Sequence, residues 1–212
     1  SVKGSVIVKD FSKEKFKMNL KSNKVNVIKI LPGGVVTAKD TAEIELDANG
    51  EFVRNPEVDL VKVAVVERHQ GTGNVACGFL KGYGIKEGAV ALSVAHDSHN
   101  IIVVGVNDEE MEFAVNSLIE QEGGIVLVKE GKVIESMPMP IAGLMSDQSG
   151  EWVDQKLTDI HEKAYEELGI CGDVEPVMTL CFMSLAVIPE IKLTDMGLFD
   201  VTTFSFIPVE VE

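Results

Sequence analysis

The chain has few of the residues that mark secreted, membrane-spanning or thiolate-metal proteins. Its 212 residues include only three cysteines, Cys77, Cys171 and Cys181, without CxxC spacing. So sparse and odd a set predicts neither a disulfide framework nor a zinc site built from thiolates. No apolar run reaches the roughly 18 to 20 residues of a membrane-spanning helix, and "SVKGSVIVKDFSKEKF" lacks a signal peptide's apolar stretch. We therefore expect a cytoplasmic protein with reduced cysteines and no membrane partner.

Positive charge is also scarce. Lys and Arg number 19 against 34 Asp and Glu, which gives a formal net charge of −15. Residues 1–30 hold eight lysines against Asp10 and Glu14, so this segment carries +6 and the other 182 residues carry −21. Because an acidic body repels phosphate backbones, nucleic acid is not an expected partner. The basic segment could instead lie against an acidic surface, including one on the same chain.

The first part of the chain is rich in short strand patterns. Residues 1–56 alternate between β-type stretches and turns, with a strong turn signal at Asn49-Gly50 and strict alternation in "AEIEL". Helical periodicity is weak here. We predict a β-rich leader over residues 1–56 that packs on a main domain formed by residues 57–212.

The main domain begins with longer apolar runs. These are "LVKVAVVERH", "GAVALSVAH", "NIIVVGV" and "GIVLVKEG". Near-continuous runs rich in valine and isoleucine are typical of strands covered on both faces, and helices have to provide that cover. The predicted fold class is α/β in the α+β sense, a layered mixed β-sheet covered by two main helices, with a β-rich N-terminal segment.

Two stretches supply those helices. The first begins after Asn107, with Glu110 in the capping-box position and acids in the first turn, and Gly123-Gly124 ends it. The second runs from about Ser149 to Leu168. Each has one apolar face at helical spacing. The faces consist of Met111, Ala114, Val115, Leu118 and Ile119, and of Val153, Leu157, Ile160, Ala164 and Leu168. Near the C-terminus, "DVTTFSFIPVEVE" alternates in the way a final strand would.

Polar residues gather after two of the apolar runs. Such positions, where a strand passes into a loop, are the usual place for a ligand site in an α/β fold. The first group lies in "AVVERHQGTGN" and the second in "SVAHDSHN". The candidate residues are Glu67, Arg68, His69, Thr72, His96, Asp97, His99 and Asn100.

Three interpretations of these groups remain open from spacing alone. An imidazole beside a carboxylate can be held as a general base in one tautomer. The HxxH spacing of His96 and His99 could offer two metal ligands, but further ligands would have to come from His69, His161 or scattered acids. The third interpretation is a polar turn whose side chains satisfy the backbone.

Three longer strings resemble the C-terminal domain of adenine deaminases of the amidohydrolase superfamily. They are "VAVVERHQGTGNVACGFLKGYGIKEGAVALSVAHDSHNIIVVGVNDEEM", "MPMPIAGLMSD" and "VIPEIKLTDMGLFDV". The resemblance covers about residues 25–212 with compatible order and spacing. It is far more specific than any of the short motifs.

The resemblance implies an accessory domain of a longer metal-dependent hydrolase. Full-length members carry a (β/α)₈ barrel with a binuclear manganese or iron centre ahead of this domain. They hydrolyse adenine, a cyclic amidine, to hypoxanthine and ammonia in purine salvage. The barrel's metal-binding histidines, including its HxH motif, have no counterpart among the four histidines here. We therefore expect no metal cofactor in this chain, assign no catalytic residue to it and expect it to be inactive alone.

The resemblance also suggests partners for the chain. These are the barrel of the same enzyme, adenine, and further copies in a homo-oligomer. The eight candidate residues are then expected to shape or close the adenine pocket. An alternative is a free-standing regulatory module that binds a purine or a partner without catalysis. A third hypothesis is an independent metal hydrolase that uses His69, His96 and His99.

Overall fold

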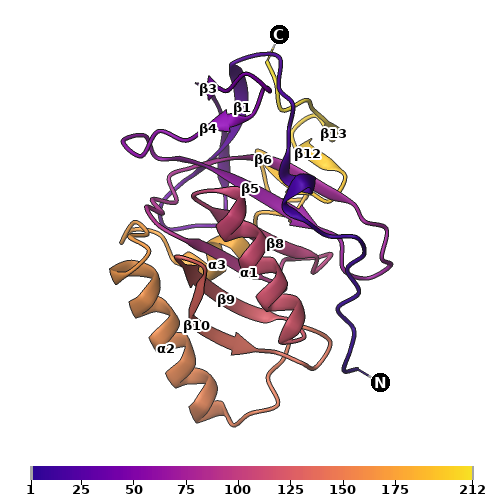
Figure 1. Ribbon diagram of the computed structural model, residues 1–212, viewed down its shortest axis with the longest axis vertical. Helices are drawn as coiled ribbons and strands as arrows, with labels where there is room; N and C mark the ends of the chain where they lie inside the picture. The colour runs from indigo at the N-terminus through magenta and orange to yellow at the C-terminus, as the bar shows by residue number, and fades with distance from the viewer. Residues whose placement is uncertain (1, 212) are drawn as a thin grey trace.

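The valine- and isoleucine-rich runs form the centre of an eight-stranded sheet in the computed structural model, which describes residues 2–211 (Figure 1). Every neighbouring pair of strands is antiparallel except β1 and β6, which are parallel. In their order across the sheet, the strands are β10 (Lys132–Pro138), β9 (Gly124–Lys129), β7 (Ala89–Leu92), β8 (Ile101–Gly105), β5 (Leu60–Val66), β6 (Val75–Lys81), β1 (Lys24–Ile30) and β2 (Thr37–Glu43).

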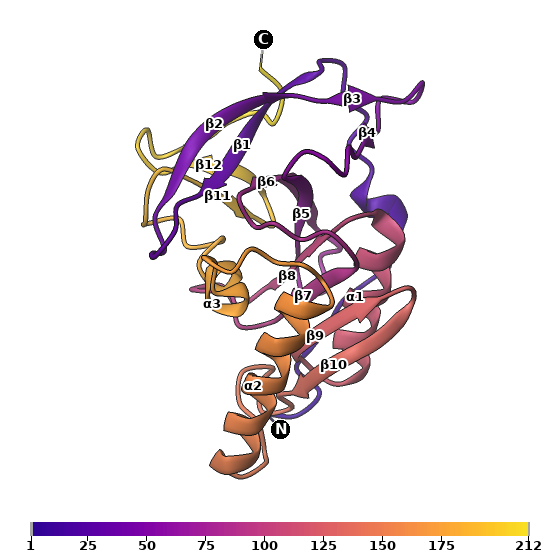
Figure 2. The same cartoon turned by 90° about the vertical axis from the view of Figure 1, so that its left-hand side faces the viewer.

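Helices cover both faces of this sheet, as the continuous apolar runs predict. Helix α1 (Asp108–Glu120) packs on one face, and α2 (Gly150–Glu166) with the short α3 (Pro176–Cys181) packs on the other (Figure 2). Alternate residues of β5 enter the two cores. Ala64 and Val66 belong to the core beneath α1, and Val63 and Val65 to the core on the α2 side. The fold class predicted from the sequence is therefore confirmed.

Both main helices begin at the predicted positions, and each has a capping side chain. The Asn107 side chain accepts a hydrogen bond from the Glu110 backbone N–H at 2.8 Å, and Ser149 accepts one from Trp152 at 3.3 Å. Each cap satisfies an N–H group that has no partner inside its helix. Within the described residues, no helix is both long and apolar enough to cross a membrane.

The N-terminal part contributes to the main sheet. Strands β1 and β2 form one end of it, whereas β3 (Glu45–Leu46) and β4 (Phe52–Val53) pair separately. Before β1, a short 3₁₀ helix, η1, spans Lys13–Phe16. The basic residues contact acids of the same chain, because Lys3 pairs with Asp147 and Lys13 with Glu109, both at 2.9 Å.

The C-terminal part departs from its sequence pattern. The alternation after Asp200 predicts one final strand, but this prediction is wrong over most of its length. A three-stranded sheet forms instead from β11 (Ile191–Thr194), β12 (Gly197–Asp200) and β13 (Ser205–Phe206). The Asp200 carboxylate accepts hydrogen bonds from the backbone N–H groups of Thr202 and Thr203, at 2.9 and 3.2 Å. These hydrogen bonds from the backbone to a nearby side chain stabilise a turn and so disfavour an extended strand.

Candidate functional site

The two predicted polar groups lie side by side where the central strands of the eight-stranded sheet end. Val66, the last residue of β5, pairs with both Val75 and Ile101, which begin β6 and β8. The connections that precede those two strands therefore meet. We call this region the loop edge and define it as residues 67–74, 93–100 and 139–145.

Arg68 holds the loop edge together. Its side chain is only 1% exposed. The guanidinium donates hydrogen bonds from Nε to the His99 carbonyl at 2.5 Å and from Nη2 to the Ala142 carbonyl at 3.1 Å. Its backbone N–H donates to Asn100 Oδ1 at 3.3 Å. Within residues 2–211, Arg68 makes no ion pair with a carboxylate. Burial lowers the pKa of the guanidinium, but a group of this kind stays charged.

Gly143 lets the third segment of the loop edge approach Arg68. Its φ is +72°, and a Cβ at this position would lie 2.7 Å from Arg68 Nη1, so there is no room for a side chain. Buried Ser93 fixes the same segment, since its hydroxyl donates to the Gly143 carbonyl at 2.6 Å and accepts from the Gly124 N–H at 2.8 Å. The sequence patterns do not single out Ser93 or Gly143, although both lie within or beside the strings that carry the family resemblance.

Glu67 organises its own loop. Its carboxylate accepts hydrogen bonds from the backbone N–H groups of His69, Gln70 and Thr72 at 2.6, 2.7 and 2.9 Å, and from the Thr72 hydroxyl at 3.1 Å. Burial alone would raise the pKa of this carboxyl, but the four donors lower it to about 2. Glu67 is therefore ionised at neutral pH, and its oxygens are engaged within the loop.

The histidines of the second loop pack against one another and against an aromatic ring. The ring centroids of His96 and His99 are 5.1 Å apart, and His96 stacks on Phe182 at 5.0 Å. Burial, followed by the charges of His96 and Arg68, lowers the pKa of His99, which favours its neutral form. His96 Nδ1 lies 4.0 Å from the nearest Asp97 oxygen, too far for an orienting hydrogen bond.

Exposure and hydrogen bonding differ across the eight candidates. The side chains of His96 and Asp97 are 41% and 82% exposed, whereas Glu67, Arg68 and Asn100 are buried. His69 and Thr72 are exposed as well, but His69 Nε2 lies 2.7 Å from the Ser98 carbonyl, and the Thr72 hydroxyl bonds to the Glu67 carboxylate. The groups left open to a ligand are thus one imidazole, of His96, and one carboxylate, of Asp97.

Asp195 connects the loop edge to the three-stranded sheet. It lies between β11 and β12 and accepts hydrogen bonds from Asn100 Nδ2 at 3.3 Å and from Asn74 Nδ2 at 3.4 Å. Spacing does not predict Asp195, because it is separated from Asn100 by 95 positions in the sequence. Through Arg68 and Asp195, all three strings that resemble the family meet at this edge.

The described residues offer no metal centre. Among residues 2–211, no three or more His, Cys, Asp or Glu side chains are grouped so that they could hold a metal ion. His69, His96 and His99 lie on adjoining loops without forming such a group, and His161 contacts Glu175 on the α2 side of the sheet. The loop edge can instead supply hydrogen bonds and one exposed negative charge.

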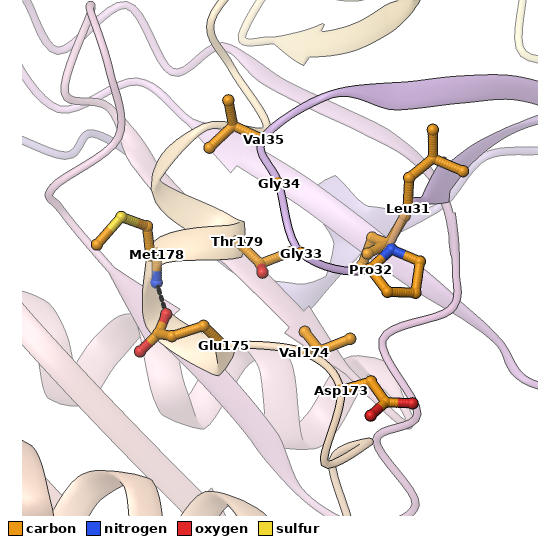
Figure 3. Close-up of a pocket in the computed structure, with 11 residues that line it drawn as sticks. Leu31, Pro32, Gly33, Gly34, Val35, Asp173, Val174, Glu175, Met178 and Thr179 are labelled. Atoms are coloured by element: carbon orange, nitrogen blue, oxygen red, sulfur yellow. Dashed lines mark hydrogen bonds between the residues drawn. The ribbon is translucent and has the colours of Figure 1, made fainter.

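A separate pocket of about 430 Å³ opens between the β1–β2 connection and the segment that begins α3 (Figure 3). Its walls include Leu31, Pro32 and Val35 on one side and Val174 and Met178 on the other. None of the eight candidate residues lines this pocket. Glu175 is turned toward the Met178 N–H, which it caps.

Comparison with known proteins places these features in a family. The sequence model described as "Adenine deaminase C-terminal domain" matches residues 34–205. The chain is 67% identical over 210 residues to adenine deaminase 2 of Desulfotalea psychrophila, covering 99% of the chain and 36% of that protein. It is 49% identical over 212 residues to adenine deaminase of Ligilactobacillus salivarius, covering 100% of the chain and 37% of that protein.

The match is to one part of each relative. A third relative, adenine deaminase 2 of Carboxydothermus hydrogenoformans, is 45% identical over 209 residues, which cover 99% of the chain and 36% of that protein. The chain thus spans little more than a third of the length of these proteins. With the family model matching most of its residues, the chain belongs to the adenine deaminase C-terminal domain family.

Proposed function

We propose that the chain is the C-terminal part of an enzyme that hydrolyses adenine to hypoxanthine and ammonia. The observation that carries this proposal is the 67% identity, over 99% of the chain, to a protein named adenine deaminase 2. In the proposed enzyme the loop edge faces the catalytic barrel and helps to close the adenine pocket. The barrel of the same polypeptide and adenine are thus the partners of this domain, and further copies of the enzyme assemble with it.

The manganese or iron implied by the family resemblance has no fitting ligand group among residues 2–211. We assign that centre to the barrel, where a metal ion would make water a better nucleophile near neutral pH. The residues of this chain would bind and orient the purine and exclude water from it. No proton transfer is assigned to them.

The course of the N-terminal segment supports this orientation. The Val2 carbonyl accepts a hydrogen bond from the Ala142 N–H at 2.7 Å, and the Ile7 N–H donates to the Arg68 carbonyl at 2.8 Å. The segment therefore crosses the loop edge. In the longer relatives, further polypeptide precedes such a C-terminal domain. In the proposed enzyme that polypeptide would therefore join the domain next to the loop edge.

His96 and Asp97 are the residues proposed to reach adenine. A purine presents ring nitrogens that accept hydrogen bonds and an exocyclic amine that donates them. The Asp97 carboxylate can accept from the amine, and the His96 imidazole can serve a ring nitrogen. Arg68 and Glu67 would act behind them by fixing the loops, since their own polar groups are already engaged.

The test is Asp97→Ala in the full-length enzyme, with Asp154→Ala on an exposed position of α2 as the matched control. Loss of one hydrogen bond to the substrate should lower kcat/KM for adenine by roughly three- to tenfold. The melting temperature should not change, because the Asp97 side chain is 82% exposed. Unchanged kinetics for Asp97→Ala would overturn the pocket role, and no ammonia from adenine with the unaltered enzyme would overturn the activity.

A further inference from the structure

An aromatic patch lies on the three-stranded sheet. We define it as Met196, Phe199, Phe204 and Phe206. Met196 is 67% exposed, Phe204 76% and Phe206 55%. Phe199 lies between the other two rings, with centroids 5.3 Å from each and near-perpendicular planes. Single exposed apolar residues are ordinary on protein surfaces, but a contiguous cluster of aromatic rings marks an interaction site.

The patch is held in place by a buried carboxylate. Asp200, only 3% exposed, accepts hydrogen bonds from Thr202 Oγ1 at 2.6 Å and from two backbone N–H groups of the turn that presents Phe204. Asp200 also pairs with Lys39 of β2 at 3.1 Å. The rings are therefore presented by an ordered turn, which reduces the entropy lost when a partner binds.

The composition around the patch is that of an interface. Charged residues make up 25% of the whole chain, yet residues 196–207, "MGLFDVTTFSFI", contain only Asp200, and its carboxylate is buried. Interface cores are depleted of charge and enriched in aromatic residues and methionine. The patch has this composition.

The patch continues into the loop edge. Met196 Sδ lies 3.5 Å from Asn74 Nδ2, and the same amide donates to Asp195. Asp195 in turn accepts from Asn100. A body that covers the loop edge would thus also lie next to Met196 of the aromatic patch.

We propose that the aromatic patch is the surface on which the preceding, catalytic part of the full-length enzyme packs. This inference rests on the proposed function for the identity of that part. Two observations favour it over a second copy of this domain. The relatives contain almost two thirds of their length outside the matched region, so this partner accompanies every copy. The patch also adjoins the loop edge, which the proposed function places against the same part.

The experiment is hydroxyl-radical footprinting of Met196, Phe204 and Phe206 in the full-length enzyme and in the chain alone. We expect oxidation of these side chains to be severalfold slower in the full-length enzyme. Val133, which is 45% exposed on β10 at the far end of the sheet, serves as the reference position. Equal oxidation in the two proteins would overturn the proposal. Protection in the chain alone that grows with its concentration would also overturn it, in favour of self-association.

A double substitution provides the second arm. Phe204→Ser with Phe206→Ser in the full-length enzyme should raise oxidation of Met196 toward the level of the chain alone, and Val133→Ser should leave it low. Unchanged protection in the double variant would overturn the proposal. Thermal unfolding of the chain alone with the same substitutions checks that the domain still folds. None of these readouts uses adenine, so they can fail while the deamination test succeeds, and the reverse also holds.

Discussion

Lys192, like Arg68, is a buried charge that makes no ion pair within residues 2–211. It lies on β11, is 0% exposed, and donates from Nζ to the Val35 carbonyl at 2.9 Å. Burial lowers the pKa of this amine from 10.5 to about 8. Lys62 on β5, which is 6% exposed, makes a useful contrast because it pairs with Asp108 at 2.8 Å. The ammonium of Lys192 therefore destabilises the folded chain at neutral pH, whereas that of Lys62 has its charge balanced.

Lys192→Met should stabilise the chain at pH 7 by about 2 kcal/mol. The burial penalty removed is about 3 kcal/mol, and the hydrogen bond lost is worth about 1 kcal/mol. The folded-state pKa is depressed, so between pH 8 and 10.5 the folded state releases its proton before the unfolded state does. The free energy of unfolding of the wild-type chain therefore rises across that window, and the advantage of the variant shrinks. Urea unfolding at pH 7 and pH 10 measures both effects.

The control for Lys192→Met is Lys62→Met. It should destabilise the chain by about 1 kcal/mol, because it removes hydrogen bonds to Asp108 and to the Phe16 carbonyl. A Lys192→Met gain that is the same at both pH values would contradict the assignment of the penalty to the buried charge.

At the scale of elements, the start of α1 depends on one side chain. Asn107→Ala should lower the free energy of unfolding by about 1 kcal/mol, because the Glu110 N–H loses its acceptor. Asn107→Asp keeps an acceptor oxygen and places a negative charge at the helix N-terminus, so it should retain wild-type stability. Chemical denaturation of the two variants checks the pair. If both variants lose the same free energy of unfolding, the loss in Asn107→Ala does not come from the missing capping hydrogen bond.

Elements with strong local patterns are predictable from the sequence. The cap at Asn107 and the apolar face of α2 depend on residues within one or two turns of each other, and both helices form as predicted. The final-strand prediction fails because the Asp200 side chain competes with an extended backbone, and alternation of apolar residues does not register that competition. Local chemistry then overrides the pattern.

The candidate site is predictable only in part, for a similar reason. Strand ends identify the two polar loops, and their meeting follows from the pairing of Val66 with Ile101. The bond from Arg68 to Ala142 spans 74 positions, so no local pattern contains it. Spacing also cannot show that the side chains of Glu67 and Arg68 hydrogen-bond within the loops, whereas those of His96 and Asp97 remain exposed.

At the scale of the whole molecule, the chain alone should not deaminate adenine. It carries no group of side chains fit for a metal ion among its described residues, and it corresponds to little more than a third of its relatives. Ammonia release from adenine should stay at the blank level with added manganese or iron, and the full-length enzyme is the positive control. Metal-dependent turnover by the chain alone would contradict the assignment of the metal centre to the barrel.

The one parallel pairing in the sheet bears on how this domain is made. β1 buries Val25, Val27 and Ile28, and one of its edges pairs with β2, which follows at once. The other edge pairs with β6 at Ile28 and Lys29, and with the C-terminal segment at Val25 and Asn26. During synthesis, β1 and β2 can pair as a hairpin soon after they leave the ribosome. The second edge then stays unpaired until β6 and, later, the C-terminal segment have emerged. Unpaired strand edges invite aggregation, so this edge remains exposed to aggregation until residues 209–211 have emerged.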